Sequence, residues 1–268
     1  MYFSISQQIR QHVLEMIFLA KASHIGSCFS IADILSVLYF SFLRIDPREP
    51  LHPDRDRCIV SKGHAAAAVY ATLAVRGFFP VEELKTFCQP GSLLLGHLHH
   101  KVCGVELSTG SLGHGLSVGC GLALAAHRER KSYRTVVIVS DGEMNEGSIW
   151  EAALFAAHHK LSQLVCIVDY NKIQSFGSVE EVLTLASLSE KFLAFGWEVE
   201  EIDGHDHQEI ERALHRKADK PLSIIAHTVK GKGVSFMENQ LAWHYKNPSY
   251  EEYQKALQEV CDPLLLQR

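Results

Sequence analysis

The sequence lacks the features of several classes of protein. No run of about eighteen apolar residues occurs, so we expect no membrane-spanning helix and no membrane partner. The first residues also lack the basic start and unbroken apolar stretch of a secretory signal, because Gln7, Arg10 and Glu15 interrupt them. An excess of positive charge is missing too, since 26 basic residues stand against 31 acidic ones. Nucleic acid is therefore not an expected partner.

Paired cysteines are also missing. The seven cysteines are an odd number, and no two of them form a Cys-x-x-Cys pair. Neither a disulfide framework nor a structural zinc site is expected from this pattern. Cys166 lies inside the apolar run of residues 164–168, where a thiol behaves as a small hydrophobic group. Reduced thiols and the lack of a secretory signal predict a cytoplasmic protein.

What the sequence does contain is enough apolar material for a large core, with 47% hydrophobic and 21% charged residues. Apolar spacing predicts helices at residues 1–20 (after a Ser4 cap), 30–42, 64–75, 81–87, 116–126, 149–158 and 208–218. Short apolar runs predict strands at residues 58–60, 136–139, 164–168 and 222–226, and a further strand is expected at 197–202.

The alternation of these strands and helices is typical of an α/β fold. We expect a doubly wound, mostly parallel sheet with helices on both faces. No linker or repeat divides the chain, so one domain over residues 1–246 is predicted, followed by a helical tail at 247–268 with a helix near 250–260.

Polar residues follow two of the predicted strands at the point where each ends. Asp141 comes directly after the strand at 136–139, and Asn171 follows the strand at 164–168. Each alone is typical of an ordinary turn or loop. The 28 residues between Gly142 and Asn171 leave room for one crossover helix, which would bring both residues to the same edge of a parallel sheet. A carboxylate and an amide oxygen suit Mg²⁺.

This pattern resembles the thiamine diphosphate motif of the transketolase family. The resemblance rests on Asp141-Gly142, on Glu146-Gly147, and on Asn171-Lys172-Ile173. It implies that Asp141, Asn171 and the Ile173 carbonyl hold Mg²⁺ or another divalent cation such as Ca²⁺. It also places Gly142 close to the diphosphate and Glu146 and Asn171 among the cofactor-binding residues. Ser140 stands where the family usually has glycine.

Further segments resemble transketolases in the same order along the chain. They are His24-Ile25-Gly26, the segment 61–65 with His64, Gly96-His97, the glycine turn at 104–113, and the segment 230–244 that ends in His244. The resemblance implies that His24, His97 and His244 are catalytic residues that orient the donor sugar and relay protons. It assigns cofactor binding to His64, Gly110, Leu112 and His244.

Some residues depart from the family pattern or carry no prediction. His114, Tyr245 and the segment 98–100 differ around the expected substrate channel. Among the 16 histidines, one without motif context is more often a surface or satisfied core residue. No role is therefore assigned to His12, His127, His158, His159, His205, His207 and His215. The glycines at 113–119 do not match the spacing of a dinucleotide-binding loop.

The family resemblance implies transfer of a two-carbon ketol unit from a ketose or its phosphate to an aldose or its phosphate. The alternatives are another thiamine diphosphate-dependent synthase, a 2-oxoacid decarboxylase subunit, or a binding subunit without turnover. Full-length transketolases carry a pyrimidine-binding domain after the present one, and the tail at 247–268 is too short for it. The expected partner is therefore a C-terminal transketolase subunit in a heterotetramer, with the small-residue helices at 116–126 and 152–157 packing between subunits. No activity of this chain by itself is expected.

Overall fold

A computed structural model describes residues 1–261 and shows five strands in one parallel sheet. The strands are β1 (Arg57–Val60), β2 (Thr135–Ser140), β3 (Leu164–Tyr170), β4 (Glu198–Asp203) and β5 (Leu222–His227). Their order across the sheet is β1-β2-β3-β5-β4, and every neighbouring pair is parallel. The predicted parallel α/β fold and all five predicted strands are confirmed, with ends that shift by one or two residues.

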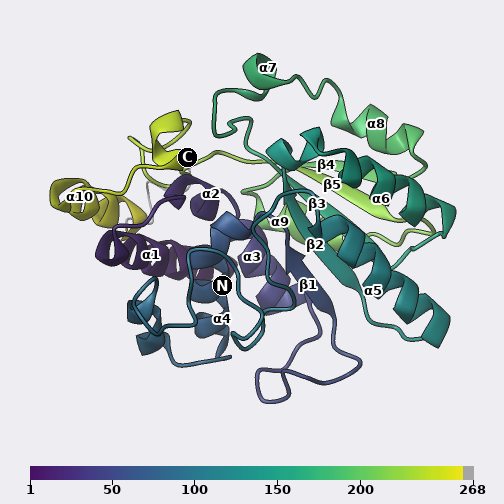
Figure 1. The fold of residues 1–268 in the computed structure, drawn as a ribbon, viewed down its shortest axis with the longest axis horizontal. Helices are drawn as coiled ribbons and strands as arrows, with labels where there is room; N and C mark the ends of the chain where they lie inside the picture. The colour runs from purple at the N-terminus through teal and green to yellow at the C-terminus, as the bar shows by residue number, and fades with distance from the viewer. Residues whose placement is uncertain (262–268) are drawn as a thin grey trace.

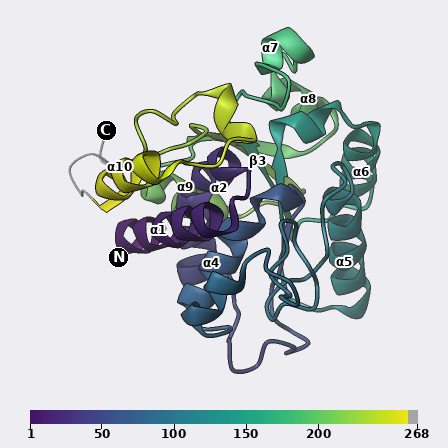
Figure 2. The same ribbon diagram turned by 60° about the vertical axis from the view of Figure 1, so that its left-hand side comes forward.

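Helices cover both faces of the sheet, as predicted. Alternate residues of each strand point to opposite sides, so Val136 and Ile138 face one apolar core while Val137 and Val139 face another. The first core contains α1 (Tyr2–Ala20) and α4 (Ala66–Arg76), and the second contains α5 (Gly115–Glu129) and α6 (Gly147–His158). Figure 2 shows the two helix layers on either side of the sheet, and Figure 1 shows α5 beside α6.

The remaining helical elements are the 12-residue α10 and several shorter helices and turns. They are α2 (Ile25–Ser30), α3 (Ala32–Val37), a π-helical turn (Leu38–Phe42), α7 (Val179–Val182), α8 (Leu188–Ala194), α9 (His207–Leu214), α10 (Tyr250–Cys261), and the 3₁₀ turns Gly63–Ala65, Val81–Thr86, Asp141–Asn145 and Leu241–His244. The helices predicted at 64–75, 116–126, 149–158 and 250–260 are confirmed within a few residues. The segment predicted at 81–87 is a 3₁₀ turn rather than an α-helix.

Three details of the predicted helices are wrong. The helix expected at 30–42 starts earlier and is interrupted at Ile31, where the backbone leaves the helical region. Ser4 lies within α1, whose N-cap is Met1. The helix expected at 208–218 ends at Leu214, because the next residues turn back to the sheet edge, where Arg216 pairs with Glu198 and Glu200 of β4.

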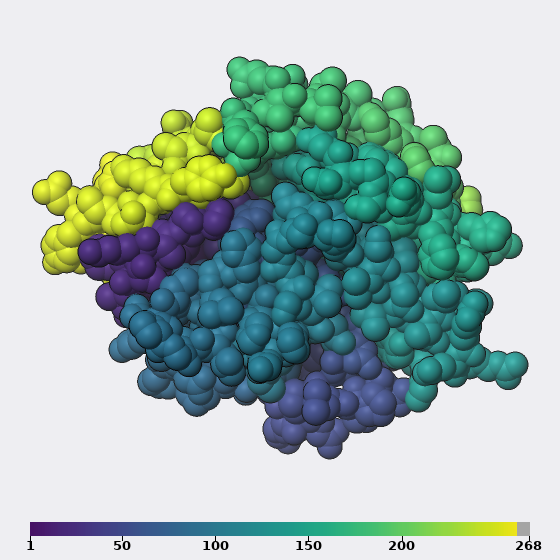
Figure 3. Space-filling view, viewed as in Figure 1, coloured from purple at the N-terminus to yellow at the C-terminus, as the bar shows by residue number. Residues whose placement is uncertain are grey.

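The two ends of the described chain lie together. Helix α10 packs against α1, where Phe18 and Tyr253 stack with ring centroids 4.3 Å apart. The C-terminal segment consequently lies against the N-terminal segment on one side of the molecule (Figure 3). The division of the chain at residue 246 stays a prediction.

Two predicted absences can be compared with the described residues. Among helices within residues 1–261, none is long and apolar enough to cross a membrane. All seven cysteines fall within that part of the chain, and each is free.

Candidate active site

The ends of β2 and β3 bring the two residues of the predicted metal site together. Ser140 is in register with Asp169, so the residues that follow each strand leave the sheet at the same edge. Asp141 is the first residue after β2, and its Oδ2 accepts a hydrogen bond of 2.6 Å from the backbone N–H of Lys172. Asn171 is the first residue after β3. The crossover predicted from the spacing thus places Asp141 directly beside the segment 171–173.

Asp141 is buried without a matching cation. Its side chain accepts backbone N–H bonds from Gly142 and Lys172, and none of the ion pairs found within residues 1–261 includes it. Burial, together with the negative charge of Asp169, raises the pKa of Asp141 to about 6, and the positive charge of Lys230 offsets only part of this shift. A cation at this carboxylate would restore its charged form.

A buried network fixes the orientation of Asn171. The Nδ2 group of Asn171 donates to Asp169 Oδ2 at 2.8 Å, and its Oδ1 accepts from the backbone N–H of Ile173 at 3.2 Å. Asp169 is held in turn by the fully buried ammonium of Lys62 at 2.5 Å and by the hydroxyl of Thr228. Burial alone would raise the pKa of Asp169, but Lys62 and the hydroxyl groups of Thr228 and Ser30 together outweigh it, so the pKa is lowered. Asp169 is therefore a charged acceptor that fixes the Asn171 amide with Nδ2 toward Asp169 and Oδ1 toward the Ile173 backbone.

The carbonyl of Ile173 already has a cationic neighbour. Lys230, from the loop after β5, donates through Nζ to the Ile173 carbonyl at 2.8 Å and lies 2.9 Å from His244 Nδ1. Burial lowers the pKa of Lys230 to about 8. The predicted metal-binding segment and the last predicted histidine are thus joined through one lysine.

The other three predicted site histidines gather around His24. The ring centroid of His24 lies 5.2 Å from that of His64, 5.3 Å from that of His244 and 6.0 Å from that of His97. His24 caps α2 with a left-handed backbone, and its N–H donates to the carbonyl of His244 at 3.0 Å. Tyr245 is exposed beside them, with its ring 4.6 Å from that of His244.

The buried imidazoles of this cluster are held neutral. Burial lowers the pKa of His24 to about 4 and that of His244 to about 3, and it lowers the pKa of His64 well below its usual value. The ammonium groups of Lys62 and Lys230 act in the same direction. Neutral imidazoles can each donate and accept one hydrogen bond, which suits contact with sugar hydroxyls.

The glycine turn lies against the segment that carries His64. A Cβ atom on Gly63 would come within 2.2 Å of the Thr109 carbonyl oxygen, so only glycine permits this close approach. Gly110 follows directly, and a Cβ built there would meet the His97 ring at 3.4 Å. The motifs at 61–65, 96–97 and 108–113, which are separate in the sequence, therefore border one another.

The remaining predicted cofactor residues lie around this turn. Leu112 is half-buried, Gly142 is half-buried at the Asp141 turn, and Glu146 is exposed at the start of α6. The backbone of Gly113 approaches Glu146 closely, since a Cβ on Gly113 would meet Glu146 Cβ at 2.7 Å. The structure thus places every predicted site residue near the carboxyl ends of β1, β2, β3 and β5, or in the loops beside them.

Several residues of this site were not predicted from the sequence. Lys62 and Asp169 form the buried ion pair, Lys230 joins the two halves, and Glu143 accepts bonds from Ser61, Gly113 N–H and Ser140 N–H. One sequence signal could have revealed Asp169, because a single acid near the end of an apolar strand needs a partner. The partners themselves are distant in sequence and could not be found from spacing.

Comparison with known proteins identifies the family. Residues 3–259 match the family described as transketolase, thiamine diphosphate binding domain. This chain belongs to the transketolase family. The predicted resemblance is therefore confirmed over nearly the whole chain.

Individual transketolases show the same relation. An apulose-4-phosphate transketolase subunit of Phocaeicola vulgatus is 43% identical over 261 residues, which cover 96% of this chain and 92% of that protein. A 6-deoxy-6-sulfo-D-fructose transketolase subunit of a Clostridium species is 42% identical over 94% of this chain and 93% of that protein. The transketolase structure from Campylobacter jejuni superposes with a TM-score of 0.92 and 32% identity over 97% of this chain. This chain spans only 42% of that transketolase.

Membership of the transketolase family means that the domain binds thiamine diphosphate with a divalent cation. The residues at the strand ends fit that cation. They offer hard oxygen atoms from one carboxylate, one amide and one backbone carbonyl, and the Asp141 carboxylate is buried without an ion-pair partner among residues 1–261. No group of three or more histidine, cysteine or acidic side chains suited to another kind of metal centre is found in the same residues.

Proposed function

We propose that this chain is the N-terminal subunit of a two-chain transketolase that moves a two-carbon ketol unit from a ketose phosphate to an aldose phosphate. When bound, thiamine diphosphate supplies the electron sink that lets a carbon–carbon bond beside a carbonyl break. The observation that carries the proposal is that Lys230 joins the Ile173 carbonyl to His244 of the histidine cluster. Asp141, which is buried and has no ion pair among residues 1–261, lies beside the same segment.

In this proposal Asp141, Asn171 and the Ile173 carbonyl hold the divalent cation. Asp169 supports this role, because its bond from Asn171 Nδ2 turns Oδ1 away from Asp169 and toward the backbone of Ile173. Partners of this kind orient metal ligands and change metal affinity strongly. Lys230 would be positioned to exchange its bond to Ile173 for one to a phosphate oxygen.

The histidines divide into two groups by their surroundings. His64 and His244 are next to Lys62 and Lys230, which supports contact with the diphosphate. His97 stands farther out beside Gly110, which supports contact with the donor sugar. His24 lies between them and would bond to sugar hydroxyls. The sugar itself would carry a terminal anionic group, as the names of the two similar subunits indicate for their substrates.

The partner in this proposal is a C-terminal transketolase subunit that carries the pyrimidine-binding domain. Two findings support it: the similar Phocaeicola protein is named as one subunit of a transketolase, and this chain aligns with only 42% of a full transketolase. The outer faces of α5 and α6 offer a surface for assembly, because Val118, Leu154 and Phe155 are exposed and a Cβ built on Gly121 would meet no atom within 4 Å. Two copies of each chain would complete a heterotetramer.

Mixing the two subunits tests the proposed function. The chain and its C-terminal subunit, with thiamine diphosphate and Mg²⁺, should transfer the ketol unit between sugar phosphates, while neither of the two chains should do so by itself. Pyruvate in place of the ketose separates ketol transfer from decarboxylation. Robust turnover by this chain alone, or turnover with pyruvate only, would contradict the proposal.

A further inference from the structure

The turn that follows β4 is tightly fixed against the end of β5. The N–H of Gly204 donates to the His227 carbonyl at 2.8 Å, and a Cβ on Gly204 would come within 2.4 Å of the Thr228 side chain. Within the turn, the N–H of His205 donates to Asp203 Oδ1 at 2.8 Å. The backbone at residue 205 therefore has little freedom, and its side chain projects from a defined place.

The His205 ring connects two distant segments. Its Nδ1 lies 2.8 Å from Asp33 Oδ2 on α3, and its Nε2 lies 2.8 Å from the backbone nitrogen of Val229. A backbone N–H can only donate, so Nε2 must be the acceptor and Nδ1 must carry the proton that Asp33 accepts. Both nitrogens are used in one neutral tautomer.

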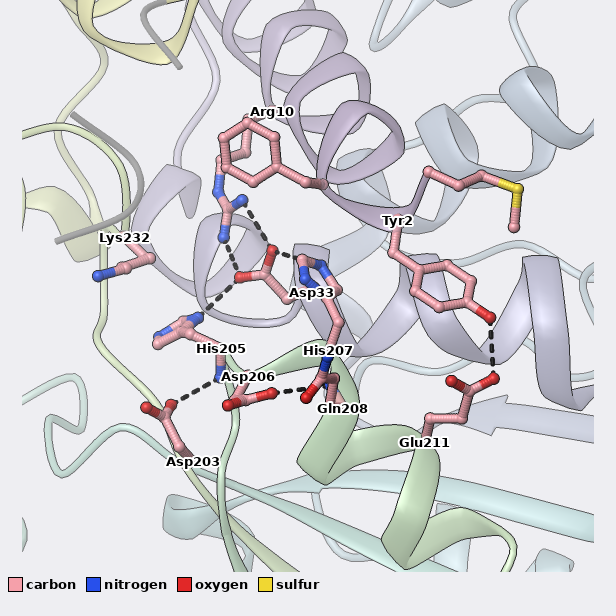
Figure 4. Close-up of a pocket in the computed structure, with 12 residues that line it drawn as sticks. Tyr2, Arg10, Asp33, Asp203, His205, Asp206, His207, Gln208, Glu211 and Lys232 are labelled. Atoms are coloured by element: carbon pink, nitrogen blue, oxygen red, sulfur yellow. Dashed lines mark hydrogen bonds and ion pairs between the residues drawn. The ribbon is translucent and has the colours of Figure 1, made fainter. Parts of the chain in front are cut away.

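Asp33 is itself held as a fixed acceptor. Arg10 on α1 donates two bonds to its carboxylate, at 2.6 and 3.1 Å, and both side chains are buried. Burial alone would raise the pKa of Asp33, but Arg10, His205 and His207 together hold it well below its usual value. These side chains line a cavity of about 750 Å³. Figure 4 shows Arg10, His205 and His207 converging on Asp33.

The anchored amide of Val229 precedes the lysine that joins the two halves of the active site. Lys230 is buried, and its ammonium contacts the Ile173 carbonyl and His244. We infer that His205 is a positioning residue: held by Asp33, it fixes the Val229 amide and thereby places Lys230 between the metal-binding segment and the histidine cluster. This inference rests on the proposed function only for what Lys230 does there.

His207 provides a matched control. Its Nε2 approaches the same carboxylate, at 3.3 Å from Asp33 Oδ1, yet it has no hydrogen bond to residues 228–230. A general loss of packing around Asp33 would follow from a change at either histidine. Loss of the Val229 anchor would follow only from a change at His205.

Hydrogen exchange of the full chain tests the anchor directly. In His205→Ala, the Val229 amide should exchange about tenfold faster or more, because its acceptor is gone. His205→Gln should restore part of the protection, since the amide side chain keeps one donor and one acceptor. His207→Ala should leave Val229 exchange unchanged. Unchanged exchange in His205→Ala, or equal acceleration in His207→Ala, would overturn the inference.

Cofactor binding tests the consequence for Lys230. In the assembly with the C-terminal subunit, His205→Ala should raise the Kd for thiamine diphosphate with Mg²⁺ about tenfold and leave kcat at saturating cofactor within about twofold. In a Lys230→Met background, the same change should add no further loss. Independent, additive losses would overturn the inference.

The two experiments also separate failure of the inference from failure of the proposed function. If the wild-type assembly neither binds cofactor nor transfers a ketol unit, the proposed function fails, and the exchange measurement still decides whether His205 anchors the loop. If His205→Ala does not fold, His205→Gln and His207→Gln are compared instead. His205→Gln should lose some protection of the Val229 amide, though less than expected for His205→Ala, and His207→Gln should lose none.

Discussion

Asp33 and Asp141 are both buried aspartates, but their surroundings differ in kind. Asp33 is 4% exposed and is paired with Arg10, and nitrogens of His205 and His207 lie 2.8 and 3.3 Å from its oxygens. Asp141 is 2% exposed, accepts only backbone N–H bonds, and has no ion pair among the described residues. The pKa of Asp33 is therefore well below its usual value, and that of Asp141 is raised to about 6.

The difference separates two uses of a buried charge. A carboxylate whose cation is a side chain stabilises the fold and positions its neighbours, as Asp33 does between α1, α3 and the turn after β4. A buried carboxylate that has no cationic side chain as its partner lowers the stability of the fold until a bound cation supplies the counter-charge. The predictions below test this contrast.

The largest effect is expected from breaking the paired site. Asp33→Asn leaves the buried guanidinium of Arg10 without its counter-charge and should lower the free energy of unfolding by about 3–5 kcal/mol, measured in urea. Asp46→Asn is the control, since Asp46 pairs with Arg48 on the surface and its loss should be barely measurable. A similar small loss at both positions would contradict the assigned role of Asp33.

The pH dependence of this effect has a defined sign. Because the pKa of Asp33 is lowered in the folded chain, its contribution is fully present above the unfolded value of about 4 and is lost as the pH falls through the folded pKa. The stability difference between wild type and Asp33→Asn should therefore shrink in acid. A difference that stays constant down to about pH 2–3 would show that charge is not the cause.

The histidines should separate turnover from cofactor binding. His97→Ala should reduce kcat about a hundredfold while leaving cofactor affinity nearly unchanged, because the ring is exposed beside Gly110. His64→Ala and His244→Ala should weaken binding of the diphosphate as well. Steady-state kinetics at varied cofactor concentration checks this, and equal loss of affinity in all three variants would refute the division.

The unpaired site should respond in the opposite direction to the paired one. Asp141→Asn should stabilise the cofactor-free chain at pH 7 by about 1–3 kcal/mol, because it removes a buried charge. Because the pKa of Asp141 is higher in the folded chain, this group favours folding at a pH below its pKa in the unfolded chain. That contribution to the free energy of unfolding is lost as the pH rises through about 6. In urea unfolding, the stability gained by Asp141→Asn over wild type should thus disappear at about pH 4. A lower free energy of unfolding for Asp141→Asn than for wild type at pH 7 would contradict this prediction.

The smallest effect concerns the end of the turn that carries His205. Asp206 caps α9 by accepting the N–H groups of Gln208 and Glu209. Asp206→Ala should lower stability by about 1 kcal/mol. Exchange at the Val229 amide should stay protected, because the His205 ring keeps its own bonds to Asp33 and Val229.

The sequence predicted the unpaired site better than the paired one, for a physical reason. Asp141 and Asn171 follow strongly apolar strands, and parallel pairing brings such ends together without knowledge of any other contact. Asp33 and His205 are 172 positions apart, and each alone is typical of an ordinary polar residue. His205 was therefore assigned no role, although the structure gives both of its nitrogens a partner.

The same limit applies to parts of the fold. Strands β2 and β3 could be predicted because nearly all their residues are buried and form continuous apolar runs. The interruption at Ile31 and the end of α9 at Leu214 depend on contacts with distant segments, such as that of Arg216 with β4. Local spacing carries no information about those contacts.

Binding of cofactor to an Asp141 variant tests the central claim most directly. In the assembly of this chain with its C-terminal subunit, calorimetric titration should show Mg²⁺-dependent thiamine diphosphate binding that is weakened well over tenfold, or by about 2 kcal/mol or more, in Asp141→Ala. Asn171→Ala should lose less. Unchanged affinity in Asp141→Ala would contradict the claim that the buried carboxylate takes its counter-charge from the bound cation.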